Sequence, residues 1–312
     1  MMQQENDLMT RTIEKFRRSQ EKKRELIQYL IKHKPWLIKS VWKRKRIKDC
    51  WHVLLFEQLA NGEHKLRSGS FCKYDKFCLA CSTRRAIKMI QRFEQYIMQN
   101  SLYKKNRYYI VLTIRHSSND KLGDLLHKLI SSKDQLARRY RNGKRVQVKN
   151  KSFFSQFDGM VSSIEITKNK NGWHPHLNLL VCTDNEVHID NNRYSSPSWK
   201  GSHTNEQIRS EWKNITWDSF IHNIRKIDVS QNHFSLDGIG EVFKYAIKFS
   251  SLAVDQLAEI VELQQKRKYR FYDMYGIFRK WKTNNTEKFK NNRQEEIFMF
   301  DDILKEYRVG KV

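Results

Sequence analysis

Three side chains at alternate positions of one extended segment offer ligands for a divalent cation. Residues 172–181 read Gly-Trp-His-Pro-His-Leu-Asn-Leu-Leu-Val, and strand alternation places His174, His176 and Asn178 on one side. Imidazole nitrogens and an amide oxygen can bind a divalent metal, and Glu165, in the apolar stretch before them, can complete the set. The segment predicts a metal site on one face of a strand; the alternative is that both histidines are structural.

A second candidate group lies on an expected helix that begins near residue 239. At 100° per residue the apolar side chains of this segment fall on one arc. The opposite arc carries a carboxylate, a phenol and two ammonium groups: Glu241, Lys244, Tyr245 and Lys248.

A phenol with a pKa of about 10 is a poor nucleophile at neutral pH unless cations lower that pKa or a metal polarises the atom attacked. Lys248 and the predicted metal site can supply both aids to Tyr245. The expected reaction is attack on a DNA phosphodiester, with Glu241 activating a water or hydroxyl to resolve the covalent bond. The alternative is a Glu and Tyr pair that decorates a helix surface.

Four cysteines form a third group, at positions 50, 72, 78 and 81. The Cys-x2-Cys step from Cys78 to Cys81 lets two thiolates reach one tetrahedral zinc, and Cys50 and Cys72 would close a structural site. His52 can substitute for Cys50, and the alternative is a set of buried reduced thiols. Cys182 stands apart and is expected in the core.

The charge balance indicates a polyanionic partner. Lys and Arg number 60 against 34 Asp and Glu, a formal net charge of +26, and aromatic residues make up 12%. Nucleic acid fits this combination, because phosphates neutralise cations and bases stack on rings; the alternative is a merely basic, solvated surface. Within residues 1–49, Arg44, Lys45 and Arg46 near Trp42 predict a basic arm that contacts DNA.

The remaining features place the chain among cytoplasmic proteins. The N-terminal residues are polar and no apolar run approaches the roughly 18 residues of a membrane span. Neither an export signal nor an anchor is expected, and the cysteines should remain reduced.

These groups must be positioned by an α+β fold. β-branched and apolar runs predict strands at 108–116, 153–167 and 172–181, and a short strand at 224–229. A type I′ turn at Asn171 and Gly172 would join two of them into a hairpin and bring Glu165 next to the histidines. Helices are expected at 82–99, 121–141 and 206–223, on one side of a central antiparallel sheet.

The expected domains are a basic helical arm at 1–49, a Cys-rich zinc segment at 50–90, a nicking domain at 91–282, and a polar linker with a C-terminal tail at 283–312. Residues 295–312 are expected to form a small capping helix.

Over roughly residues 50 to 281 the chain resembles the rolling-circle plasmid replication initiators of the HUH endonuclease superfamily. The likeness rests on the Cys-rich segment and on four motifs. These are Tyr-Ile-Val-Leu-Thr-Ile (109–114), His-Pro-His-Leu-Asn-Leu-Leu-Val (174–181), Glu-Val-Phe-Lys-Tyr-Ala-Ile-Lys (241–248) and Tyr-Gly-Ile-Phe-Arg-Lys-Trp (275–281).

The resemblance implies a ferredoxin- or RRM-like sheet, Mg²⁺ or Mn²⁺ at the strand histidines, and Tyr245 as the nucleophile of a 5′-phosphotyrosyl intermediate. It implies a plasmid double-strand origin, single-stranded or cruciform, as substrate, with host helicase and polymerase as partners, and Glu241 as the residue that ends the cycle by hydrolysis. The family usually has His-hydrophobic-His, which puts ligands at 176 and 178, yet position 178 is Asn.

Two rival functions remain. One is a single-tyrosine transposase or relaxase, although relaxases usually place the tyrosine before the histidine motif. The other is a non-catalytic, zinc-stabilised nucleic-acid-binding protein in which Tyr245 and the histidines are structural.

Overall fold

A computed structural model describes residues 20–58, 64–145, 152–187, 203–218, 222–227, 242, 252–267, 269–281, 295–301 and 306–309. The chain divides into two compact units. One comprises residues 1–85, 252–268 and 285–312, and the other comprises 86–251 and 269–284. Among the described residues, no helix combines the length and apolar character needed to cross a bilayer.

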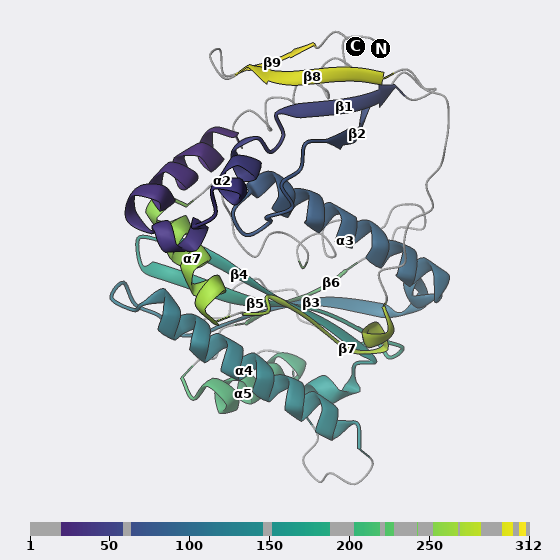
Figure 1. Ribbon diagram of the computed structural model, residues 1–312. Coiled ribbons are helices and arrows are strands. Elements are labelled where there is room, and N and C mark those ends of the chain that lie inside the picture. Colours follow the sequence, from purple (N-terminus) through teal and green to yellow (C-terminus); the bar gives the residue numbers. More distant parts are fainter. Residues whose placement is uncertain are drawn as a thin grey trace. The chain divides into compact units, whose positions relative to one another are not determined.

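The second unit is built on a five-stranded sheet in the order β6-β3-β5-β4-β7 (Figure 1). Its strands are β3 (Asn106–Thr113), β4 (Gly159–Asn169), β5 (Gly172–Thr183), β6 (His222–Lys226) and β7 (Tyr272–Gly276). Every pair of neighbours is antiparallel. The expected α+β class with a central antiparallel sheet is confirmed.

Helices cover both faces of this sheet, so the expectation of helices on one side is wrong (Figure 1). On one face Phe93 and Ile97 of α3 (Leu79–Gln99) pack against strand residues. On the other lie α4 (Leu122–Gly143) and α5 (His203–Thr216). The physical reason is that β3 and β5 are buried on both sides over most of their length, and each side needs a cover.

The hairpin of β4 and β5 sets the register on which the candidate site depends. Glu165 lies directly opposite His176, and Ser163 lies opposite Asn178. The expected turn is displaced by one residue, because Asn169 pairs with Gly172. It is not type I′, which needs positive φ at both central residues: only Gly172 has positive φ, 98°, and the Asn171 N–H donates to Asn169 Oδ1 at 2.8 Å.

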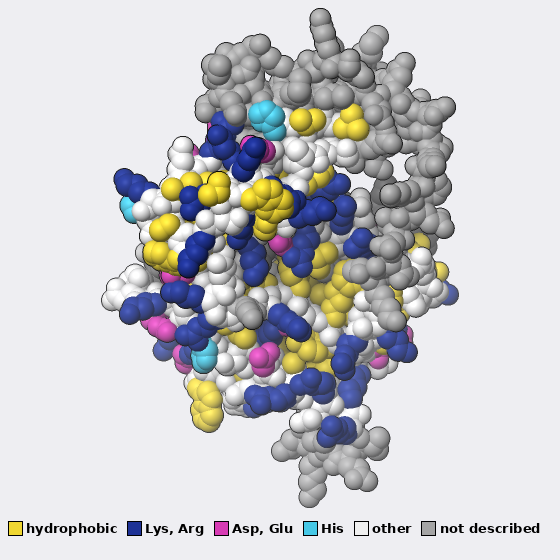
Figure 2. All heavy atoms as spheres, viewed as in Figure 1, with side chains coloured by type: hydrophobic (Ala, Val, Ile, Leu, Met, Phe, Trp, Pro, Cys, Tyr) yellow, Lys and Arg dark blue, Asp and Glu magenta, His cyan; other side chains and the backbone are white. Residues whose placement is uncertain are grey.

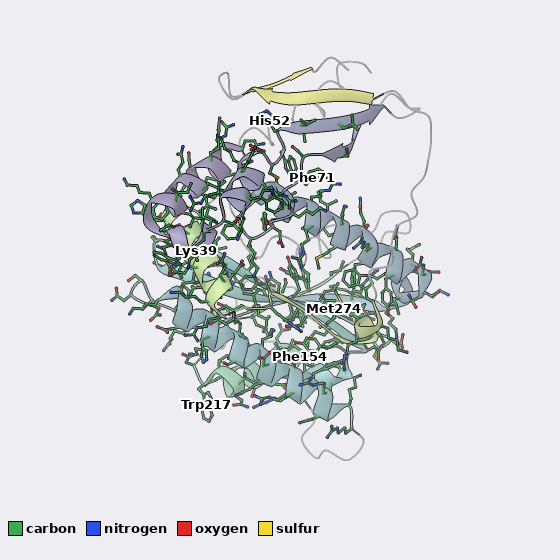
Figure 3. All side chains as sticks on the ribbon, in the orientation of Figure 1. Lys39, His52, Phe71, Phe154, Trp217 and Met274 are labelled. Carbon is green, nitrogen blue, oxygen red and sulfur yellow. The ribbon has the colours of Figure 1, made fainter. Side chains whose placement is uncertain are left out.

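The strand expected at 153–167 begins later. Residues Phe153–Gln156 form the 3-10 helix η3, because Ser152 Oγ accepts from the Phe154 N–H and caps it. Phe154 is fully buried beside Phe157 (Figure 3). The aromatic run thus fills the core next to the sheet rather than extending it.

The first unit contains a helix at residues 20–33, η1 (Pro35–Ile38), α2 (Val41–Lys48) and α7 (Val254–Arg267). Its four-stranded sheet has the order β2-β1-β8-β9, made of β1 (Val53–Gln58), β2 (His64–Gly69), β8 (Glu295–Asp301) and β9 (Glu306–Val309). The capping helix expected at 295–312 is therefore wrong. The segment pairs with β1 through β8, and this long-range partner outweighs local propensity.

Gly276 ends β7 in a conformation that other residues rarely adopt, with φ 60° and ψ −135°, before η4 (Ile277–Lys280). A Cβ there would lie 2.0 Å from Asp158 O and 2.2 Å from Tyr140 Oη. We expect Gly276→Ala to lower the free energy of unfolding by at least about 3 kcal/mol, because it adds backbone strain and a backbone clash. Urea denaturation measures this change.

The matched control is Gly123→Ala, in the first turn of α4, where φ is negative. This variant should be as stable as the wild type or slightly more stable, because alanine favours a helix. Equal stability of both variants would contradict the role of Gly276.

Candidate functional site

The predicted metal ligands come together on the sheet face that α3 covers. His174, His176 and Asn178 alternate along β5, and Glu165 stands beside His176 on β4. The same register places Thr113 of β3 opposite His176 on its other side. Three adjacent strands therefore contribute polar side chains to one face.

The imidazole rings are in direct contact. The His174 ring meets the His176 ring edge-on at a centroid separation of 4.0 Å and stacks on His116 at 4.2 Å. His174 Nε2 lies 3.2 Å from Thr113 Oγ1, and Thr167 Oγ1 donates to the His174 carbonyl at 2.9 Å. The strand backbone and two threonines thus fix the orientation of His174.

Asn178 is 2% exposed and donates from Nδ2 to Glu165 Oε2 at 3.3 Å. The amide stands where the resembled family usually has a second histidine. Its nitrogen holds the Glu165 carboxylate, and its oxygen is a hard donor suited to Mg²⁺ or Mn²⁺. Imidazole, carboxylate and amide groups are all donors that proteins use to bind divalent metals.

Burial, together with the neighbouring His176 and His116 and against the opposing effect of Glu165, lowers the pKa of His174 to about 4. The ring is therefore neutral at neutral pH. A neutral imidazole keeps a lone pair available for a metal ion or a hydrogen bond.

This shift predicts a pH dependence of stability. In the unfolded chain the histidine titrates near its ordinary value of 6.5, so between about pH 6.5 and 4 the unfolded state binds the extra proton. The wild type should lose more stability than His174→Gln as the pH falls through this window, measured by urea denaturation without added Mg²⁺ or Mn²⁺. If the free energy of unfolding depends on pH in the same way in both proteins, the prediction is wrong.

The predicted tyrosine helix is represented by a single described residue. Val242 is helical and fully buried in a cluster with Tyr109, Val161 and Leu180, on the face that carries the histidines. This agrees with its place on the apolar arc. Tyr245, Glu241, Lys244 and Lys248 lie outside the described residues.

The four cysteines of the first unit converge. Their sulfur atoms all lie within 4.8 Å of one another and all four residues are buried and free of disulfides. The Sγ separations are 3.5 Å for Cys50 and Cys81, 3.5 Å for Cys72 and Cys81, and 3.6 Å for Cys78 and Cys50. Sulfurs bound at about 2.3 Å to one tetrahedral zinc stand about 3.8 Å apart. The group can therefore hold a metal such as zinc, with Cys50 rather than His52 in the set.

Backbone donors and buried cations surround this cluster. The Cys72 N–H donates to Cys50 Sγ at 3.2 Å. Lys23, only 4% exposed, donates from Nζ to the Cys50 carbonyl at 2.7 Å. Burial lowers the pKa of Lys23, while the nearby sulfurs of Cys78, Cys50 and Cys72 oppose that change. The positive charge of Lys23 favours the thiolate, which is the form that binds metal, whereas burial of the sulfurs opposes it.

Arg84 adds a second positive charge at the cluster. Its guanidinium lies 3.5 Å from the centroid of the Phe71 ring. Burial lowers the pKa of Arg84, and the sulfurs of Cys81 and Cys50 oppose that effect. Lys23 and Arg84 together offset the charge of several thiolates.

Of the residues predicted to contact DNA, Lys244 lies outside the described residues, and the other three have different roles in α2. Arg44 donates from Nε to the Ile38 carbonyl at 2.7 Å and so ties α2 to η1. Arg46 lies 4.6 Å from the centroid of the exposed Trp42 ring. Lys45 is exposed. Only Lys45 and Arg46 therefore present a surface suited to phosphate.

Sequence reasoning missed His116 and Thr113 as members of the histidine face. Both follow the apolar run of β3, and His116 was included only as the last residue of an expected strand. The strand ends at Thr113 instead, and the chain beyond it brings His116 onto His174. A histidine at the end of a central strand was the available signal.

Comparisons with known proteins identify the family of this chain. The model of the family described as "Replication protein" matches residues 63–309. A curated relative, "Protein rep" of Lentilactobacillus hilgardii, is 27% identical over 142 residues. The alignment covers 45% of this chain and 41% of the relative, so the chain spans less than half of that protein. No solved structure matches. Because the family model covers most of the chain, the resemblance is confirmed at this level: the chain belongs to the Replication protein family.

Proposed function

We propose that this protein initiates plasmid rolling-circle replication by nicking one strand of the origin DNA, with Tyr245 as the nucleophile. The observation that carries the proposal is the burial of Val242 against Val161 and Leu180 on the face of the histidines. Three residues of chain span at most about 11 Å in any conformation. We propose that this short connection lets the Tyr245 phenol reach the face that holds the candidate metal ligands.

Each residue of the tyrosine segment has a separate role in the proposed cleavage reaction. The phenol oxygen of Tyr245 attacks the phosphorus, the bond to the 3′ oxygen breaks, and the 5′ phosphate stays on the tyrosine while a free 3′ hydroxyl primes synthesis. Lys248 stabilises the phenolate, and Lys244 holds the DNA backbone. Glu241 accepts a proton from the water that later hydrolyses the phosphotyrosyl bond.

His174, His176, Asn178 and Glu165 would hold the divalent ion, Mg²⁺ or Mn²⁺. When bound, such an ion polarises the phosphate and neutralises its charge. The contribution of the chain is a rigid set of donors: Asn178 orients Glu165, and Thr113 orients His174.

The four cysteines would hold a structural Zn²⁺. Their buried, closed arrangement leaves no position for a substrate, which distinguishes a structural from a catalytic site. This site would link the segments around Cys50, Cys72 and Cys81 within the first unit.

A DNA contact is proposed for the exposed basic surface of α2. Burial lowers the pKa of Lys43, and the like charge of Lys76 lowers it further. In the described part of the chain no carboxylate pairs with Lys43, Lys45 or Arg46. Phosphates would relieve this repulsion.

We expect Lys45→Glu to weaken binding of origin DNA about fivefold or more at low salt, because a repulsive charge replaces a phosphate contact. Its stability should not change, since the side chain is exposed. Filter binding at two salt concentrations checks the affinity. The control is Lys32→Glu, which makes the same charge change at an exposed position of the 20–33 helix and should bind DNA as the wild type does. An equal loss of DNA affinity in both variants would contradict a DNA contact at the α2 surface.

The proposal as a whole is tested with 3′- and 5′-labelled single-stranded origin DNA. After incubation with Mn²⁺ and denaturation, label from the segment 3′ of the nick should remain on the protein, and the other product should carry a free 3′ hydroxyl. A purely nucleic-acid-binding protein leaves no label on the denatured chain. A transposase or relaxase also forms the bond, but its preferred sequence would not be a plasmid replication origin.

A further inference from the structure

A groove of about 1000 Å³ runs along the outer edge of β7 in the second unit. One wall comes from the C-terminal end of α4 and the other from β7 and η4. Because β7 is the edge strand of the five-stranded sheet, its outer backbone groups face this groove.

The groove is strongly basic. Five cations line it: Arg141, Lys144, Arg270, Arg279 and Lys280. All five are exposed, and in the described part of the chain none of them pairs with a carboxylate. Figure 2 shows Lys and Arg side chains gathered over α4 and β7.

The two carboxylates of the groove are already neutralised. Asp158 accepts from Lys105 Nζ at 2.8 Å, and Asp273 pairs with the buried Lys133. Both lysines lie outside the lining. The groove therefore presents an unbalanced positive charge to whatever enters it.

The floor is rigid and partly aromatic. Tyr140 donates to the Asp158 carbonyl at 3.2 Å, and its ring meets Tyr275 edge-on at 6.2 Å. Gly276 lets the Asp158 carbonyl approach the strand closely. Tyr272 adds a half-buried ring to the lining.

The groove leads to the histidine face. Tyr272 lies opposite Ser163 on β4, and Ser163 lies opposite Asn178 on β5, so all three share one face. Two strand spacings separate Tyr272 from Asn178, about 10 Å. Met274, two residues further along β7, points to the same face and packs on the cluster that contains Val242 (Figure 3).

We propose that this groove binds the sugar–phosphate backbone of a single strand of DNA and guides it across β7 onto the histidine face. The inference deepens the proposed nicking function and rests on it. Cations without carboxylate partners favour phosphates, and a concave channel with an aromatic side chain suits an unpaired strand. Two other occupants are conceivable: an acidic peptide that pairs with the edge strand, and a DNA duplex that lies over it. The test distinguishes both from a single strand.

The test uses the full chain and a fluorescein-labelled DNA of mixed sequence, about 20 nucleotides long, without added Mg²⁺ or Mn²⁺. Anisotropy titrations over a range of salt give Kd. The variant Arg279→Ala with Lys280→Ala should bind about tenfold more weakly, and its dependence of log Kd on log salt should be shallower by about 1.4, because each lost single-strand phosphate contact contributes about 0.7.

Two further variants test whether the loss of DNA affinity is specific to the groove. Arg141→Ala, on the α4 wall, should weaken binding and reduce the salt dependence by about 0.7. The control Arg138→Ala with Lys213→Ala removes two exposed charges from α4 and α5 outside the groove and should bind as the wild type. An unchanged salt slope in both groove variants overturns the proposal.

Competitors identify the occupant. Unlabelled single strand should displace the probe, whereas the matching duplex and polyglutamate should compete much less. Equal competition by the duplex, or displacement by polyglutamate, overturns the assignment to a single strand.

Covalent adduct formation with Mn²⁺ is measured in parallel on wild-type protein. If the wild type forms no adduct while the groove variants lose binding, the nicking proposal fails and the groove stands. If the wild type forms the adduct and the groove variants bind normally, the groove proposal fails alone.

Discussion

Replacing Tyr245 with phenylalanine is expected to reduce strand cleavage at least about a thousandfold, because the variant keeps the ring and lacks the only atom that attacks phosphorus. Denaturing gels of labelled origin DNA measure cleavage, and mass spectrometry of the wild-type adduct identifies the linked residue. DNA affinity should stay within a few-fold, since removing one hydroxyl changes neither the charge nor the size of the side chain.

A matched comparison is Tyr103→Phe, at an exposed tyrosine of η2 (Leu102–Lys104) that should not affect cleavage. Cleavage by Tyr245→Phe at the wild-type rate would remove Tyr245 from the mechanism. Loss of cleavage together with loss of binding and of thermal stability would instead assign Tyr245 a structural role.

Replacing Cys81 with serine is expected to release the bound metal and destabilise the first unit by at least about 3 kcal/mol, because metal-binding free energy contributes directly to folding. The variant should contain much less zinc by elemental analysis and should lose its cooperative unfolding transition for that unit. A strong zinc chelator should have the same effect on the wild-type protein.

Cys182→Ala provides the control. Cys182 is also buried, but it packs in the hydrophobic cluster of the second unit, and burial raises the pKa of its thiol to about 12. This variant should keep its full zinc content and lose only the stability of a small cavity. Equal zinc content in Cys81→Ser and wild type would exclude the cysteine cluster as a metal site.

Local sequence patterns predicted much of the secondary structure of the second unit. The alternation that put His174, His176 and Asn178 on one side, together with the Asn and Gly turn signal, predicted a hairpin with Glu165 on the strand beside the histidines. The exact pairing of Glu165 with His176 was not predicted, because the turn lies one residue earlier than expected. Helices α3 and α4 were also predicted close to their observed bounds.

Local sequence patterns did not predict the features that depend on contacts between segments far apart in the chain. Residues 295–301 have no local signal that names β1 as their neighbour, and a helix was expected there instead of β8. The basic groove is another such case, because Arg141 and Arg279 are far apart in sequence and line one groove only in the folded chain.

The types of residue available for chemistry were determined by the sequence itself: a histidine-rich strand, a tyrosine with basic neighbours, and four cysteines with knuckle spacing. Tertiary structure decided which of them meet. It selected Cys50 over His52, brought His116 onto His174, and directed Arg44 to a backbone carbonyl rather than to solvent. The physical reason is that residue type and spacing act along the chain, whereas ligand geometry depends on contacts between segments that only packing brings together.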